Sequence, residues 1–96
     1  MVPNTKCYVI NTANSATQTL SENVVQVESV IGLAGGATSI SAETYTVVTG
    51  TPAAGQVQFT GTPQSPSNTL TFNAALAANG LLLVTAVPIG GLRPEY

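Results

Sequence analysis

The side chains that could carry out chemistry are few and widely spaced. Four glutamates are the only acidic residues, Lys6 and Arg93 are the only cations, and the sequence contains no histidine. General acid–base catalysis by carboxylates needs two of them close together, yet Glu22 and Glu28 would lie about 20 Å apart along an extended strand. A serine or cysteine nucleophile would also lack its usual base. We therefore expect no enzymatic activity, no catalytic residues and no cofactor.

The same counts argue against several kinds of binding. Zinc and calcium sites need clustered Cys, His or carboxylate ligands, and the sequence does not group such residues. Nucleic acids and anionic membranes are bound by several cations on one face, whereas this chain has two cations and a net charge of −2. The longest apolar run, from Leu81 to Ile89, is too short for a membrane span of about 20 residues. We predict no metal, no nucleic acid and no membrane.

Cys7 is the one cysteine of the sequence and therefore cannot form an internal disulfide. Two interpretations stay open. A lone cysteine beside Tyr8 and Val9 can be a small buried apolar side chain. Alternatively, it can tie the N-terminal segment to the next subunit through an intermolecular disulfide in an oxidising setting.

The elements that must position these residues are strands, because apolar residues recur at a period of two. Val25, Val27, Ser29 and Ile31 are expected to share one side of an extended segment. The sequence predicts an all-β fold: a small β-sandwich or barrel of six to seven short antiparallel strands with extended N- and C-terminal arms. We expect an N-terminal strand or arm over residues 1–21, a core over 22–90 and a tail over 91–96.

Glycine, proline and asparagine mark the expected turns. Gly32, Gly35 and Gly36 predict a tight turn after the segment that contains the four residues above. The strands 45–49 and 56–60 are expected to form a hairpin, with Val57 and Phe59 pointing inward. Residues 74–78 are expected to form one helical turn.

The final strand, residues 81–87, is apolar on both sides. Leu81, Leu83 and Val87 point one way, whereas Leu82, Val84 and Ala86 point the other way. A doubly apolar strand is either central in the domain or covered by a neighbour. The cover could be another subunit or the chain's own N-terminal arm.

Only 6% of the residues are charged, against about 25% in an average protein. Neutral polar surfaces cost less to desolvate than ions do, which favours packing between subunits. The sequence thus predicts a structural subunit that self-assembles as a homo-oligomer, with a second structural protein as a further candidate partner. The candidate subunit contacts are Cys7, Tyr8, Leu82, Val84, Leu92 and Tyr96.

The N-terminal segment lacks the apolar stretch of a secretory signal peptide.

The second half of the chain resembles a hairpin pattern of small β-sandwich virion proteins of tailed phages. The resemblance lies in "YTVVTGTPAAGQV" from Tyr45, followed by "LTFNAA" from Leu70 and "LLVTAVP" from Leu82. This resemblance covers about Tyr45 to Gly90 and implies a capsid-decoration, fibre or tail component. At the level of architecture, the chain also resembles self-assembling appendage subunits of spore-forming bacteria. The expected setting is therefore a virion or an extracellular filament.

A function from another class stays open. The loops Gly50 to Gly55 and Gly61 to Ser67 could bind a ligand, and a small β-sandwich with such loops could recognise a glycan or a host surface. Three tyrosines and no tryptophan give it few aromatic platforms for a sugar.

Overall fold

The computed structural model describes residues 2–35, 40–76, 80–90 and 92–93. This part of the chain is all-β, as the sequence predicts, and it contains no helix. Its strands, in order, are β1 (Val2–Pro3), β2 (Lys6–Asn11), β3 (Thr17–Gly35), β4 (Ile40–Val48), β5 (Gln56–Gln58), β6 (Ser67–Phe72), β7 (Leu81–Pro88) and β8 (Leu92–Arg93).

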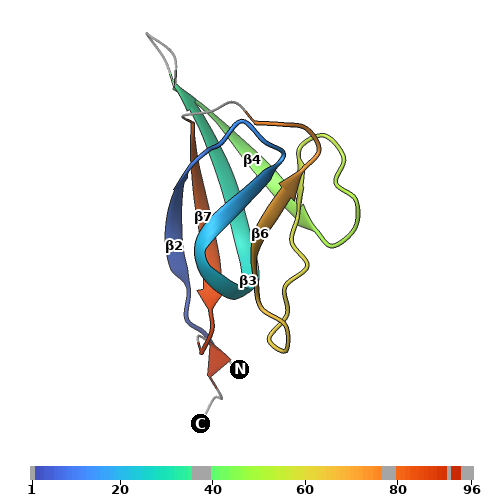
Figure 1. Ribbon diagram of the computed structural model, residues 1–96. Coiled ribbons are helices and arrows are strands. Elements are labelled where there is room, and N and C mark those ends of the chain that lie inside the picture. Colours follow the sequence, from blue (N-terminus) through green and yellow to red (C-terminus); the bar gives the residue numbers. More distant parts are fainter. Residues whose placement is uncertain (1, 36–39, 77–79, 91, 94–96) are drawn as a thin grey trace.

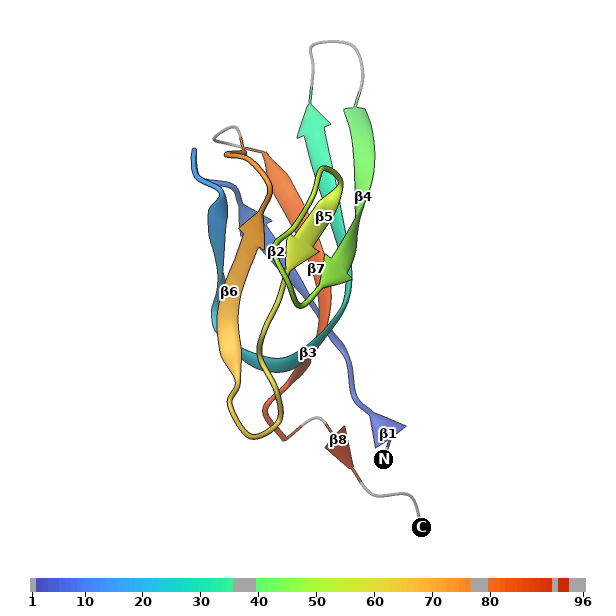
Figure 2. The ribbon, with the colours of Figure 1, turned by 90° about the vertical axis from the view of Figure 1, so that its right-hand side faces the viewer.

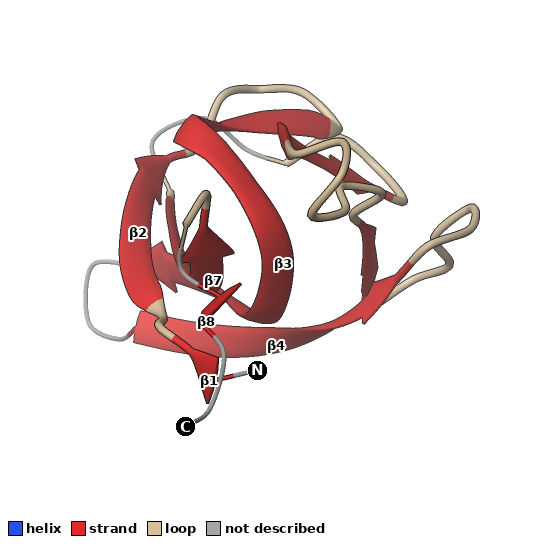
Figure 3. Ribbon diagram, turned by 90° about the horizontal axis from the view of Figure 1, so that it is seen from below, coloured by secondary structure: helices blue, strands red, loops and turns tan. Residues whose placement is uncertain are grey.

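Six strands, β2 to β7, form a small barrel, and the long strand β3 takes part in it at two places. The sheet runs in the order β2-β7-β3-β4-β5-β6, and β6 pairs again with β3. This is possible because the first part of β3 pairs with β6, whereas its second part pairs with β7 and β4. The view along the barrel shows β3 arching across the ring (Figure 3). One bent strand thus belongs to both sides of the barrel.

The interior of the barrel is apolar. Its largest fully buried side chains are Leu70, Leu82, Val24, Val30, Val57, Val84 and Val87. The predicted inward positions of Val57 and Phe59 are confirmed, because both are buried. Leu70 and Phe72, which alternate in the same way on β6, are buried too. A strict period of two therefore located the interior correctly on these short strands.

On β3 the period of two fails. The register with β7 shifts between Val24 and Gln26 and again between Val27 and Ser29, as happens where a β-bulge adds a residue to one strand. Val27 and Val30 are both buried, whereas Ile31 is half-buried on the opposite face. The prediction that Ile31 shares a side with Val27 was therefore wrong, because a bulge exchanges the two faces.

Two predicted turns differ in part from the structure. β3 continues through Gly32 to Gly35, so the chain does not turn at Gly32. It does reverse after Gly35, because β3 pairs antiparallel with β4 and Gly35 lies opposite Ile40, and Gly36 lies outside the described residues. Residues 45–49 and 56–60 do not form the expected hairpin, because β4 and β5 run parallel, with Val47 opposite Val57. Residues 49–55 lead back along β4 before β5 begins, and Gly55 supports this return with a φ of 78°.

The segment that was expected to be helical, residues 74–78, is not helical over residues 74–76, and residues 77–79 are not described.

The N-terminal segment is mostly part of the barrel. Residues 6–11 form β2, and residues 17–21 are the start of β3, so the expected arm is reduced to the residues before Lys6. β1 pairs antiparallel with β8, which places Val2 opposite Arg93. This two-stranded ribbon stands apart from the barrel beside both chain ends (Figure 2). The whole molecule is elongated, with extents of 50 × 27 × 20 Å.

Candidate interaction surface

An apolar stripe crosses the outside of the sheet formed by β2, β7 and β3. Residues directly opposite each other in antiparallel strands share a face, and the register places Leu83 between Val9 and Ile31. The next outward pair is Leu81 and Leu33. Val9 is 64% exposed and Leu81 is 39% exposed, while the other three are half-buried. We call these five residues the outer stripe.

The surroundings of the outer stripe are neutral. Asn11 lies opposite Leu81, and Thr44 lies opposite Ile31. The next row toward the other end of the strands places Cys7 opposite Thr85. Contiguous apolar surface with a polar rim is typical of interaction sites, and neutral neighbours lower the cost of removing water from it.

Leu82 and Val84, the two side chains of β7 that were predicted as contacts, point the other way. Leu82 and Val84 are 1% and 0% exposed in the barrel interior, and Val84 lies opposite the buried Val30. A partner could reach them only by opening the barrel, so this part of the prediction was wrong. An alternating strand shows two apolar faces, and only the neighbouring strands decide which of them is inside. Leu81 and Leu83 are the outward residues of β7.

The remaining predicted contacts have different outcomes. Cys7 is exposed with a free thiol, which contradicts its interpretation as a buried side chain and leaves the intermolecular disulfide as a prediction. Tyr8 is buried, 5% exposed, so its ring serves the interior of the chain rather than a partner. Leu92 lies in β8, which confirms only that the tail is extended there. Tyr96 lies outside the described residues.

A polar cluster bridges β2 and the first part of β3. Among the described strands, β2 forms its backbone ladder with β7 alone. On its other side, the Tyr8 hydroxyl and Lys6 Nζ both donate hydrogen bonds to Glu22 Oε1, the latter over 3.1 Å. Lys6 Nζ also lies 5.2 Å from the centroid of the Tyr8 ring. Side chains thus close the side of the barrel on which β2 and β3 share no ladder.

This cluster shifts the pKa of two of its members. Burial, followed by the hydrogen bond to Glu22 and its charge, raises the pKa of Tyr8 to about 12. The hydrogen bonds from Tyr8 and Lys6 lower the pKa of Glu22 below its ordinary value of 4.5. The Lys6–Glu22 pair is largely exposed, so its own contribution to stability is small.

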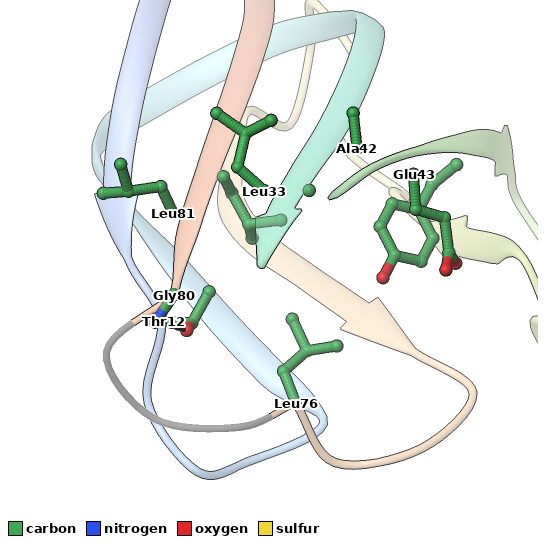
Figure 4. A pocket seen from close by; sticks show the side chains of 10 residues that line it. Thr12, Leu33, Ala42, Glu43, Leu76, Gly80 and Leu81 are labelled. Carbon is green, nitrogen blue, oxygen red and sulfur yellow. Dashed lines mark hydrogen bonds between the residues drawn. The ribbon is translucent and has the colours of Figure 1, made fainter. Parts of the chain in front are cut away.

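A pocket of about 270 Å³ opens at the end of the barrel that lies farthest from the β1–β8 ribbon. Figure 4 shows Leu76 opposite the ends of β3 and β7, with Thr12 and Gly80 on one side and Glu43 on the other. We call it the end pocket. It is lined mainly by apolar groups, and among the described residues that line it Glu43 is the one that carries a charge.

Two segments far apart in the sequence meet at the edge of the end pocket. The Thr12 amide donates to the Gly80 carbonyl, and the Gly80 amide donates to Thr12 Oγ1, both over 2.9 Å. These two bonds join the turn after β2 to the start of β7. A side chain at Gly80 would approach Thr12 Oγ1 to 3.0 Å, so glycine fits this junction.

Tyr45 forms the wall between the end pocket and a second hollow of about 180 Å³, which also contains Glu43 and Leu76. The Tyr45 ring packs edge-on against Phe72, with 4.9 Å between the ring centroids. A Cβ at Gly32 would lie 3.0 Å from Tyr45 Cε2, so glycine makes room for the ring across the strand pair. Partial burial, followed by the charge of Glu43 and its hydrogen bond, raises the pKa of Tyr45.

Neither the end pocket nor most of the outer stripe was predicted from the sequence. Two signals were present: Glu43 and Tyr45 lie two residues apart in a strand, and Gly32 interrupts an apolar strand, which often marks close approach of another group. The contributions of Thr12, Leu76 and Gly80 had no comparable signal, because these residues meet only through the fold.

Within the described residues, no group of three or more His, Cys, Asp or Glu side chains is placed to hold a metal ion. The same part of the chain has no helix that is long and apolar enough to cross a membrane. Neither hollow holds more than one ionisable carboxylate.

Comparisons with known proteins gave no match to a family model, a curated protein or a solved structure.

Proposed function

We propose that the protein is a structural subunit that assembles with copies of itself, and with a second structural protein where one is present, into a virion component or an extracellular filament. It works by contact rather than by catalysis. Its barrel supplies a rigid body, and its outer surface supplies the contacts.

The outer stripe is the observation that carries this proposal. Val9 and Leu81 expose apolar side chains side by side with the half-buried Leu83. Burying apolar area releases roughly 25 cal/mol per Å², and a stable contact buries more than about 1,000 Å² in total. The outer stripe is well placed to form the centre of such a contact, with the neutral residues around it as the rim.

The low charge of the chain supports the same conclusion. Soluble monomers rely on net charge and mixed surface charges to stay apart, and this chain carries six charged residues with a net charge of −2. Of these, Lys6 and Glu22 are already paired with each other. Little electrostatic repulsion therefore opposes the approach of a second copy.

The test is to measure the mass of the purified protein by sedimentation while its concentration is raised, and to image the particles by negative stain. We expect large oligomers. Val9→Glu should weaken the association roughly tenfold or more, because it places a charge in the contact. Thr19→Glu is the matched control, since Thr19 is exposed on the first part of β3, outside the outer stripe. A wild-type chain that stays monomeric at every concentration would overturn the proposal.

A glycan-binding module is the second candidate, and the end pocket favours it. The Tyr45 ring and the Glu43 carboxylate offer an aromatic surface and a hydrogen-bond acceptor in one hollow. However, small-molecule pockets usually have about 300–1,000 Å³, and the end pocket lies just below this range. Binding of a glycan array by the monomeric chain, abolished by Tyr45→Ala, would select this candidate instead.

A further inference from the structure

The strand β2 has a backbone edge with which no described strand pairs. Its ladder with β7 is free of register shifts, and the Thr12 amide, next in this register, donates to the Gly80 carbonyl over 2.9 Å. In an antiparallel ladder, pairs that exchange hydrogen bonds alternate with pairs that do not. The even-numbered residues of β2 therefore direct their amide and carbonyl groups toward β7. The odd-numbered residues direct theirs toward the free edge, and they are Cys7, Val9 and Asn11.

This edge is open to a partner. Cys7 and Asn11 are exposed, and Val9 is 64% exposed. β2 lies at the margin of the barrel (Figure 1). The side-chain bridge to β3 comes from Lys6 and Tyr8, on the face of β2 opposite to Val9, so it leaves the edge uncovered. The stretch from Cys7 to Asn11 has no charge, proline or glycine, and charges, prolines and bulges are what usually prevents edge pairing.

Two other unpaired edges are less suited to pairing. Along the first part of β3, the Thr17 amide is already used by Ser15 Oγ, at 3.1 Å, and the register with β6 shifts after Thr19. The part of β4 that extends beyond its pairing with β5 carries the charge of Glu43, which opposes pairing at an edge. Among these described edges, the regular and uncharged one of β2 is therefore the best template for a further strand.

The free edge of β2 is complementary to the same edge of a second copy. A two-fold axis at Val9 places Val9 opposite Val9 of the second copy, and Cys7 opposite its Asn11. All three residues that face the edge then exchange hydrogen bonds in both copies. A register centred on Tyr8 uses fewer of them, because Asn11 then lies opposite Thr5, outside β2.

The same register suits the side chains. The two Val9 side chains lie side by side on one face, so the outer stripes of the two copies join into one apolar surface. On the other face, Lys6 lies opposite Thr12 of the second copy. Like charges therefore do not face each other across the pair, which would oppose it.

We propose that two copies pair antiparallel through β2, about a two-fold axis at Val9, and so form one continuous sheet. This inference rests on the proposed function, since it names a contact through which copies assemble. Addition of a strand to an open sheet edge is a common mode of recognition. The pair uses the same edge of both copies and is closed, and the joined outer stripes are its contact toward further copies.

Amide hydrogen exchange, quenched and measured residue by residue by NMR, tests the pairing at the atoms that form it. The amides of Cys7, Val9 and Asn11 should exchange about tenfold or more slowly in concentrated, associated protein than in the dilute monomer, because each gains a carbonyl partner. The Thr19 amide, on the unpaired edge of β3, is the control and should not change. Associated protein without protection at the three β2 amides would overturn the proposal, because packing of outer stripes alone leaves them unprotected.

A proline on each of two edges provides a matched pair of variants. Asn11→Pro removes an amide hydrogen at the free edge of β2 and leaves the outer stripe intact. Thr19→Pro is the control, because the Phe72 amide donates to the Ala16 carbonyl over 2.8 Å, and by alternation the Thr19 amide points away from β6. Edge strands tolerate prolines that face outward.

Asn11→Pro should weaken association of the two copies about tenfold or more in sedimentation, because each pair loses two hydrogen bonds. Thr19→Pro should associate like the wild type. Equal association of the two variants would contradict the pairing through β2.

A cysteine at the two-fold axis tests the register without a proline. In a Cys7→Ser background, Val9→Cys places two thiols across a pair whose Cα atoms lie about 5.5 Å apart, within the disulfide limit of about 7 Å. Asn11→Cys in the same background is the control, because the two copies of residue 11 would lie about 13 Å apart along the strands. We expect a covalent dimer from Val9→Cys on a non-reducing gel and none from Asn11→Cys.

The outcomes separate the two proposals. Val9→Cys protein that associates without a covalent dimer, or equal dimer bands from both variants, would overturn the pairing through β2 and leave the proposed function intact. A wild-type chain that never associates would overturn both proposals.

Discussion

The two faces of β7 have nearly the same composition and different environments. Leu82 and Val84 are enclosed by the barrel, whereas Leu81 is 39% exposed and Leu83 is half-buried outside it. Because the sheet closes on itself through the pairing of β3 with β6, the inner face of β7 is enclosed by the chain's own strands. The outer face has the same capacity for apolar contact without a cover from the described part of the chain. In this protein, apolar character on one strand serves folding on one side and is available for association on the other.

The largest expected effect is on the inner face. Leu82→Ala should lower the free energy of unfolding by about 2–5 kcal/mol, because it removes buried methyl groups and leaves a cavity. Leu83→Ala, its neighbour on the outer face, should change the stability of the monomer by about 1 kcal/mol or less. Urea unfolding of dilute protein measures both. Equal losses for the two variants would remove the distinction between the faces.

The same pair of variants should have the opposite ranking in association. Leu83→Ala should weaken self-association by about 1–2 kcal/mol, since it shortens a side chain in the proposed contact. Leu82→Ala, examined below its unfolding temperature, should associate like the wild type. Sedimentation equilibrium provides the measurement. If Leu82→Ala alone impaired association, the contact would depend on the interior and not on the outer stripe.

A substitution at Gly32 tests how tightly the inner face of the sheet is packed at the end pocket. Gly32→Ala places a Cβ 3.0 Å from Tyr45 Cε2, so we expect a loss of about 1 kcal/mol, at the low end of overpacking effects. Gly50→Ala is the control, because a Cβ there meets nothing within 4 Å. Thermal unfolding compares the two variants, and equal melting temperatures would show that the Tyr45 ring moves aside without a loss of stability.

The smallest expected effect concerns the side-chain bridge from β2 to β3. The pKa of Glu22 is lowered in the folded state. The carboxylate of Glu22 therefore contributes to stability above pH 4.5, and this contribution is lost as the pH falls through the folded pKa. The pKa of Tyr8 is raised to about 12. The protonated Tyr8 hydroxyl therefore contributes to stability below pH 10.0, and this contribution is lost as the pH rises toward 12.

Glu22→Gln should therefore bring the titration of Tyr8, followed by tyrosinate absorbance, down from about 12 toward 10.0. It should also flatten the acid side of the stability profile. Glu28→Gln, on the same strand, serves as the control. An unchanged Tyr8 titration in Glu22→Gln would mean that burial alone sets the Tyr8 pKa.

The strands whose apolar residues alternate without interruption could be predicted from the sequence. Val57 and Phe59 point inward as expected, and Leu70 and Phe72 follow the same alternation. β3 could not be predicted in the same way, because its register shifts exchange the two faces without any marked residue. The parallel pairing of β4 with β5 was missed because a glycine-rich loop can equally close a hairpin or lead the chain back.

The candidate site depends on these missed features. Ile31 joins the outer stripe only because a bulge precedes it. Leu82 is interior only because the sheet closes through the pairing of β3 with β6. The end pocket depends on the junction of Thr12 with Gly80, which are 68 residues apart. Local patterns determine strands, whereas which strand face stays exposed is set by long-range pairing.

The most direct test of the account is the mass of the wild-type chain in solution as a function of concentration, measured by light scattering from micromolar to millimolar. Self-assembly through the outer stripe predicts a mass that rises well above the 9.7 kDa of one chain. A constant mass of 9.7 kDa over the whole range, from a chain that melts cooperatively, would contradict it.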